Sequence, residues 1–244
     1  MAGSLSDGIV AHWKMNDVSG TTVVDNIGGF NGTWTRDVSN DSVTGKIDKA
    51  LYPNDANYAA CGNNTAFDYN TPFSVACWVK RDVAGVKRAL IGKWAAISRG
   101  WFCQFRDTNK LWFLLYHDGS HSTGMETTNT YTSTGTWVHW TFTYDGSGAR
   151  TGIRIYRNAS SVALTAIGQT TLSDTVQVVD PLTLATHLVG STIFNGSLDD
   201  IRIYDRELIQ DDIDLIYNGG AGTEDDGGGG GGATDSSTFF GSNF

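Results

Sequence analysis

Carboxylates are the residues of this sequence that could do chemistry, and aspartate supplies nearly all of them. Of the 26 acidic residues only Glu126, Glu207 and Glu224 are glutamates. Glycoside cleavage needs two carboxylates at a fixed separation across the scissile bond, and these three scattered glutamates form no such cluster. Asp199 and Asp200 are neighbours in a predicted strand, so we expect their side chains to point to opposite faces. The sequence therefore predicts that the protein is not an enzyme and has no catalytic residues.

Aspartate oxygens could also bind a cation. Asp199 has the spacing of Ile201 and Ile203 in a predicted strand, and we expect it to share their buried face. A carboxylate buried there must be hydrogen-bonded or bound to a cation. It would either anchor a loop or join Asp17 and Asp25 in binding Ca²⁺. Calcium is the one cofactor that this pattern suggests.

Aromatic residues offer a second kind of chemistry, because the segment 111–116 has apolar side chains on both faces. One face carries Leu111, Phe113 and Leu115, and the other carries Trp112, Leu114 and Tyr116. A sandwich strand usually has one face in water. Either long loops cover both faces, or one face stacks on sugars or packs on a protein. Trp112 and Tyr116, with Trp101 on the preceding strand, are the candidate binding residues.

The secondary-structure elements predicted to carry these residues are mostly short strands. Strands are predicted at 9–15, 73–79, 100–105, 110–116, 137–144 and 198–204, with turn residues such as Asp107–Asn109 between them. One short helix is predicted over 210–217, where Ile213, Ile216 and Tyr217 have helical spacing. The pattern predicts an all-β, antiparallel two-sheet sandwich with one short C-terminal helix.

The composition of the chain changes after Gly220. Residues 227–232 are all glycine, which is typical of a flexible tether. Phe239, Phe240 and Phe244 then end the chain, and we expect these rings to dock on another protein. The sequence thus predicts a sandwich domain over 1–220 and a Gly-rich docking arm over 221–244.

Charge and cysteine content exclude several classes of partner. The net charge of −9 disfavours nucleic acid and anionic membranes, and no apolar run is long enough to cross a membrane. The three cysteines form no closed disulfide framework, and Cys77 and Cys103 are expected to be small core residues. No basic region followed by an apolar stretch marks a signal peptide at the N-terminus.

The order of six segments carries a resemblance to a known family. They are 8–17, 19–25 with 31–33, 45–51, 73–80, 136–146 and, most specifically, Phe194–Tyr204 with the sequence FNGSLDDIRIY. Over roughly residues 8–219 the chain resembles the LamG-like jelly-roll family, a branch of the concanavalin A-like lectin/glucanase superfamily. The resemblance implies a jelly-roll sandwich. Members of that family occur as sugar-binding modules, adhesion modules, appendages of hydrolases and bacteriophage structural proteins.

These observations favour a non-catalytic structural or adhesion protein of a larger assembly, and we expect a phage virion surface component such as a capsid decoration, fibre or tail protein. Its partners would be other chains of the assembly, reached through the C-terminal tail, and it would be oligomeric in that context. The alternative is a carbohydrate-binding lectin-like module, and a glycan hydrolase is disfavoured. The expected location is the virion, with an extracellular location as the alternative.

Overall fold

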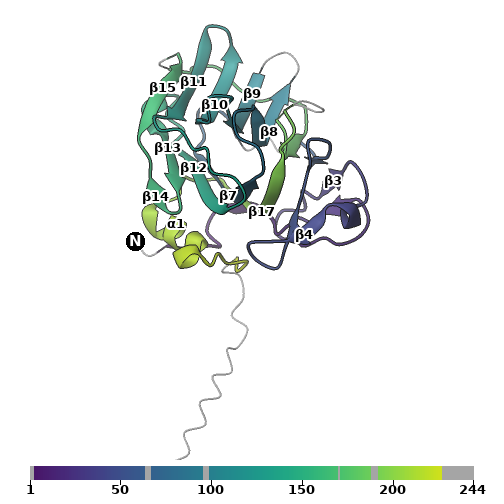
Figure 1. The fold of residues 1–244 in the computed structure, drawn as a ribbon. Helices are drawn as coiled ribbons and strands as arrows, with labels where there is room; N and C mark the ends of the chain where they lie inside the picture. Colours follow the sequence, from purple (N-terminus) through teal and green to yellow (C-terminus); the bar gives the residue numbers. More distant parts are fainter. Residues whose placement is uncertain (1–2, 64–66, 96–98, 170, 188–191, 227–244) are drawn as a thin grey trace, which may run out of the picture.

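In the computed structural model, the described residues are 3–63, 67–95, 99–169, 171–187 and 192–226. They form two antiparallel sheets that pack face to face, which confirms the predicted all-β sandwich (Figure 1). The predicted aromatic end of the tail, residues 227–244, lies outside the described residues. Within those residues, no helix has the length and apolar character needed to cross a membrane.

The first sheet contains eight of the described strands. In spatial order they are β14 (Ser160–Ser161), β13 (Ile153–Arg157), β12 (Trp137–Tyr144), β7 (Phe73–Arg81), β17 (Gly196–Tyr204), β5 (Lys49–Leu51) and β4 (Ser42–Thr44), with β1 (Ile9–Trp13) paired to β17. Three 3₁₀ turns connect elements of the chain: η1 (Val38–Asn40), η2 (Arg150–Gly152) and η3 (Asn218–Gly220).

The second sheet contains nine of the described strands. Their order is β15 (Leu164–Gly168), β11 (His121–Thr127), β10 (Leu111–Asp118), β9 (Arg99–Phe105), β8 (Arg88–Ala95), β16 (Leu182–Leu184), β6 (Ala59–Ala60), β3 (Gly32–Trp34) and β2 (Thr22–Val23). The strands β9 and β10 pair as the predicted hairpin, and the turn between them is at Asp107–Asn109.

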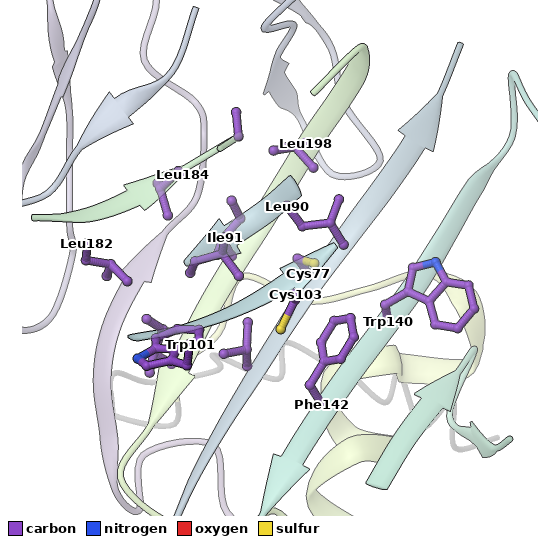
Figure 2. Close-up of a cluster of buried hydrophobic side chains, with 14 of the residues drawn as sticks. Cys77, Leu90, Ile91, Trp101, Cys103, Trp140, Phe142, Leu182, Leu184 and Leu198 are labelled. Carbon is purple, nitrogen blue, oxygen red and sulfur yellow. The ribbon is translucent and has the colours of Figure 1, made fainter. Parts of the chain in front are cut away.

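The core lies between the two sheets because alternate side chains of each strand point inward. Cys77 of β7 lies close to Cys103 of β9, with Phe142 of β12 nearby (Figure 2). Val75 and Trp101 belong to the same core cluster. The described cysteines are unpaired and buried, and burial raises the pKa of the Cys77 thiol. Cys77 and Cys103 therefore act as small core residues, as predicted.

The predicted helix is present as α1 (Gln210–Tyr217) and lies on the outer face of the first sheet, the face turned away from the second sheet (Figure 1). Ile213 and Ile216 pack there against Ala76 and Tyr204. The Asp212 carboxylate accepts the backbone N–H of Ile209 at 3.0 Å, which caps the first turn.

A β-bulge in β17 overturns the predicted position of Asp199. The backbone of Asp200 has a φ of 46°, and the pairing with β7 shifts immediately after Asp199. Asp199 therefore lies opposite Trp78 on the outer face, whereas Ile201 and Ile203 belong to the core. The prediction that the three side chains share one face was wrong, because a bulge interrupts the two-residue alternation.

The same bulge overturns the expectation that Asp199 and Asp200 point to opposite faces. The Asp200 carboxylate contacts the His12 Nε2 atom at 2.6 Å and accepts from the Arg202 Nε atom at 3.0 Å. His12 lies opposite Arg202 in the pairing of β1 with β17, and its neighbours in β1 point into the core. Both carboxylates are thus buried on the outer face of the first sheet.

Candidate functional site

The outer face of the second sheet carries a group of aromatic side chains. On the central strands β8, β9 and β10, core residues such as Trp101 alternate with the outward-pointing Trp94, Phe102 and Tyr116. The pairing register of the strands places these outward-pointing side chains next to one another, because Gly100 of β9 pairs with Trp94 on one side and with Tyr116 on the other. Three neighbouring strands therefore supply one aromatic surface.

These rings contact one another and border a hollow in the surface. The ring centroid of Trp94 lies 5.1 Å from that of Phe102 and 5.5 Å from that of Tyr116, and the His187 ring lies 4.5 Å from Phe102. The hollow has a free volume of about 350 Å³. Its lining consists of Lys87, Trp94, Phe102, Gln104, Arg106, Leu114, Tyr116, His187 and Thr192. We call this surface the aromatic hollow.

Glycines opposite the large side chains make room for the aromatic hollow. Gly100 has a φ of 130°, and a Cβ atom there would clash with the carbonyl oxygen of Lys93. At Gly92 a Cβ atom would lie 2.7 Å from His187 Cβ and 2.8 Å from Phe102 Cβ. The sequence thus places glycine where two strands and the loop at His187 approach most closely.

A cluster of polar side chains borders the aromatic hollow next to Trp112. The Trp112 indole N–H donates to Glu126 Oε2 at 2.7 Å, and the Lys110 ammonium donates to Glu126 Oε1 at 2.6 Å. The Arg106 guanidinium, which also lines the hollow, lies 3.9 Å from the Trp112 ring centroid. This arrangement orients Trp112 and Arg106 and offers hydrogen-bond donors beside half-buried rings.

The structure places the three predicted aromatic residues in two different environments. Trp112 and Tyr116 are half-buried on the outer face, whereas Trp101 is only 1% exposed and packs against Phe67 and Phe73. Trp101 is therefore a core residue that cannot contact a ligand at the surface. The sequence analysis missed Trp94 and His187. Local alternation could not have indicated Trp94, because the residue beside it on the inner face is the charged but buried Lys93.

The three carboxylates of the predicted calcium site have separate partners. The Asp25 oxygens accept four backbone N–H groups, those of His12, Ile27, Gly28 and Phe30, at 2.8–3.0 Å. The carboxylate therefore fastens the loop after β2 to β1. It satisfies four donors that would otherwise lack a partner.

Asp17 and Asp199 likewise bind backbone groups of other segments. Asp17 accepts the N–H of Val24 at 3.2 Å, and Asp199 accepts those of Lys46 and Ile47 at 2.7 and 2.9 Å. Burial raises the pKa of Asp199 to about 8. Across the part of the chain that the structure describes, no three His, Cys, Asp or Glu side chains are grouped to hold a metal ion. Calcium binding stays a prediction.

A cluster of buried polar side chains on the first sheet binds the C-terminal segment. The His12 Nδ1 atom contacts the Asp226 carboxylate, and Arg202 donates to the backbone oxygens of Thr223 and Asp225. Arg202 and His12 are fully buried. Contacts of the sandwich thus extend to Asp226, past the predicted domain boundary at 220.

The fold and the aromatic hollow define a lectin-like β-sandwich of the concanavalin A class. Residues 53–214, well over half of the chain, match the family model of the concanavalin A-like lectin/glucanases superfamily. The chain belongs to this superfamily. A search of curated proteins found no match to the sequence.

Similar solved structures include binding domains of toxins and a domain of a glycan-degrading enzyme. The binding domain of Paraclostridial Mosquitocidal Protein 1 has 19% identity and a TM-score of 0.63, over 88% of this chain and 53% of that chain. Domain 4 of AbnA, an extracellular arabinanase from Geobacillus stearothermophilus solved with arabinotriose, has 20% identity and a TM-score of 0.59, over 91% and 100%. The receptor binding domain of botulinum neurotoxin D has 17% identity and a TM-score of 0.61, over 89% and 54%.

The chain spans about half the length of the two toxin binding domains and the whole length of the arabinanase domain. At these identities the likeness shows the fold alone.

Proposed function

We propose that this chain is a non-catalytic glycan-binding module and that the aromatic hollow is its binding face. The observation that carries the proposal is the contact group of Trp94, Phe102, Tyr116 and His187 beside an open hollow. Large aromatic side chains left accessible on a sheet mark a binding surface, because water contact with apolar area is otherwise unfavourable.

Sugar rings suit this surface chemically. One face of a sugar ring presents C–H groups that can stack on Trp94 or Tyr116, while its hydroxyls need donors and acceptors. Arg106, Lys87 and Gln104 line the same hollow and supply such groups. The arabinotriose complex of the similar arabinanase domain supports an oligosaccharide as the ligand.

The positions of the glutamates support a role without catalysis. Glu126 borders the aromatic hollow, but its two oxygens are held by Lys110 and Trp112. Glu207 follows β17 of the first sheet, and Glu224 lies in the C-terminal segment, where it accepts from Asn16 at 2.7 Å. A paired acid and nucleophile, as glycoside hydrolysis requires, would need a second carboxylate beside Glu126.

The phage virion role expected from the sequence gains no support from these relatives, which are toxin and glycan-related domains. Docking of the tail to other chains of an assembly remains a separate prediction, since its aromatic end lies outside the described residues. An adhesion protein can do both, binding a glycan with the sandwich and a partner with the tail.

A glycan array probed with the purified, labelled protein tests the proposed function. The array should include arabino-oligosaccharides and charged glycans, and bound glycans should be recovered afterwards. We expect selective retention of a few related glycans, all recovered intact. A folded protein that binds no glycan would contradict the binding role, and recovery of shortened glycans would contradict the absence of catalysis.

A further inference from the structure

A second pocket lies at the edge of the sandwich, between the two sheets, and is lined by two arginines. Arg81 ends β7 and Arg157 ends β13. The rest of the lining consists of Val79, Phe105, Tyr131, Ser133, Thr136, Val138 and Trp140. Arg157 pairs with the core residue Trp140, so the strand register directs its side chain inward. Ser133 and Thr136 are exposed, which opens the pocket to solvent.

Arg81 is a buried cation without an acidic partner. Its residue exposure is 4%, its guanidinium donates to the backbone oxygen of Tyr131, and its central carbon lies 4.1 Å from the Phe105 ring centroid. Within the described residues no carboxylate forms an ion pair with it, although five other arginines have such partners. Burial lowers the pKa of Arg81, and no acid opposes this effect.

Arg157 brings a second guanidinium group to the same pocket. Its Nε atom is buried and has no hydrogen-bond partner among the described residues, and its guanidinium carbon lies 5.3 Å from the Tyr131 ring centroid. Both guanidinium groups therefore contact Tyr131, one through its carbonyl oxygen and one through its ring. Two like charges share one pocket.

The charges of the two arginines indicate which kind of ligand would bind in this pocket. A guanidinium cannot lose its proton in a protein, so both groups stay charged, and burying charge without a counter-charge is costly. A water molecule could accept from Arg157 but would neutralise neither cation. An anion between the arginines would do both. The free volume of about 20 Å³ exceeds the roughly 10–15 Å³ that one water molecule needs, so the pocket has room for a single small ion.

We propose that the pocket between Arg81 and Arg157 binds one small monovalent anion of the halide type, with chloride as the natural occupant. This site is separate from the aromatic hollow and does not depend on the proposed glycan binding. The anion would tie the ends of β7 and β13 to the segment around Tyr131, and so stabilise one edge of the sandwich.

Thermal unfolding in chloride and in gluconate at equal ionic strength tests this site, because gluconate is too large for the pocket. For the wild type we expect melting temperature to rise with chloride to a plateau roughly 2–4 °C above the value in gluconate. Arg157→Gln should lose most of this rise. Arg154→Gln is the matched control, since Arg154 is on the same strand but exposed, and it should keep the full rise.

If Arg157→Gln does not fold, anomalous diffraction from wild-type crystals that contain bromide tests the proposal instead. We expect an anomalous peak between the two guanidinium groups. Equal melting temperatures in the two salts, an equal chloride effect in Arg157→Gln, or no bromide in the pocket would each overturn the proposal.

Discussion

At the scale of single residues, buried carboxylates in this protein fasten segments together. Asp199 is fully buried, and one of its oxygens holds the backbone N–H groups of Lys46 and Ile47, two residues far away in the sequence. Asp25 does the same for the loop after β2 with four N–H groups. The sequence predicted that Asp199 is buried and could anchor a loop, and the structure confirms this interpretation.

Replacing Asp199 by alanine should destabilise the protein much more than replacing it by asparagine. Asp199→Ala leaves the N–H groups of Lys46 and Ile47 without an acceptor, and we expect a loss of about 1–3 kcal/mol in the free energy of unfolding. Asp199→Asn keeps an acceptor oxygen and should be far milder. Chemical denaturation of the three proteins at pH 6 measures this, and equal stability of wild type and Asp199→Ala would contradict the anchoring role.

The pH dependence of stability provides a second test of Asp199. Burial raises its pKa to about 8, against about 3.9 in an unfolded chain. The folded state therefore binds a proton that the unfolded state releases, and this contribution to stability is lost as pH rises toward and through 8. Asp199→Asn cannot titrate, so its unfolding free energy should fall less between pH 5 and pH 9. A steeper fall in the variant would show the opposite sign.

His12 should add a pH-dependent contribution of its own. Burial lowers its pKa, but hydrogen bonds to Asp200 and Asp226 outweigh burial, and the pKa is raised above 6.5. Its contribution is complete below pH 6.5 and is lost as pH rises through the folded pKa. In an Asp199→Asn background, Asp226→Asn lowers the folded pKa of His12, so the loss should end at a lower pH and be smaller, whereas Asp107→Asn, an exposed aspartate, should leave the profile unchanged. Identical profiles for both would contradict the role of Asp226.

At the scale of the elements, periodicity predicted the strands and the helix well. The helix at 210–217 and the strands at 73–79 and 198–204 appear within two residues of their predicted ends. Hydrophobic alternation produces these patterns locally, so the sequence shows them directly.

Strand pairing and bulges are the features that the sequence did not show. The positive φ of Asp200 cannot be inferred from its neighbours, and it moved Asp199 to the other face. The aromatic hollow depends on which strands lie side by side, since Trp94 meets Tyr116 only through Gly100. Trp112 and Tyr116 share the outer face, whereas Trp101 pairs with Leu115 and belongs to the core.

The glycine between Trp94 and Tyr116 should be intolerant of substitution. Gly100→Ala introduces a Cβ atom that clashes with the Lys93 carbonyl oxygen at a φ of 130°, and we expect a loss of about 1–3 kcal/mol. Gly119→Ala is the control, because the nearest atom to its Cβ is 3.8 Å away. Differential scanning calorimetry of both variants checks this, and similar melting temperatures would contradict the close approach of β8 and β9.

The C-terminal segment should count as part of the sandwich as far as Asp226. A chain that ends at Gly220 removes the acceptors of the buried Arg202 at Thr223 and Asp225, and we expect a loss of about 3–5 kcal/mol. A chain that ends at Asp226 keeps them and should match the full chain. Comparing the three unfolding curves tests this, and equal stability of the two truncated chains would show that residues 221–226 contribute nothing.

At the scale of the whole molecule, the two sheets have different surroundings. The first sheet is covered on its outer face by α1 (Figure 1) and by the C-terminal segment, whereas the aromatic hollow lies on the second. One sheet is thus completed by the chain itself, and the other is available for a ligand. This asymmetry is the central reason to assign binding to the second sheet.

The most direct test of that assignment is a calorimetric titration of an array-selected glycan into wild type and two tryptophan variants. Trp94→Ala removes a ring from the aromatic hollow, and Trp137→Ala removes a half-exposed ring from β12 of the first sheet. We expect Trp94→Ala to weaken glycan binding by roughly tenfold or more, and Trp137→Ala to bind the glycan as the wild type does. Unchanged affinity in Trp94→Ala, or an equal loss in Trp137→Ala, would contradict this assignment.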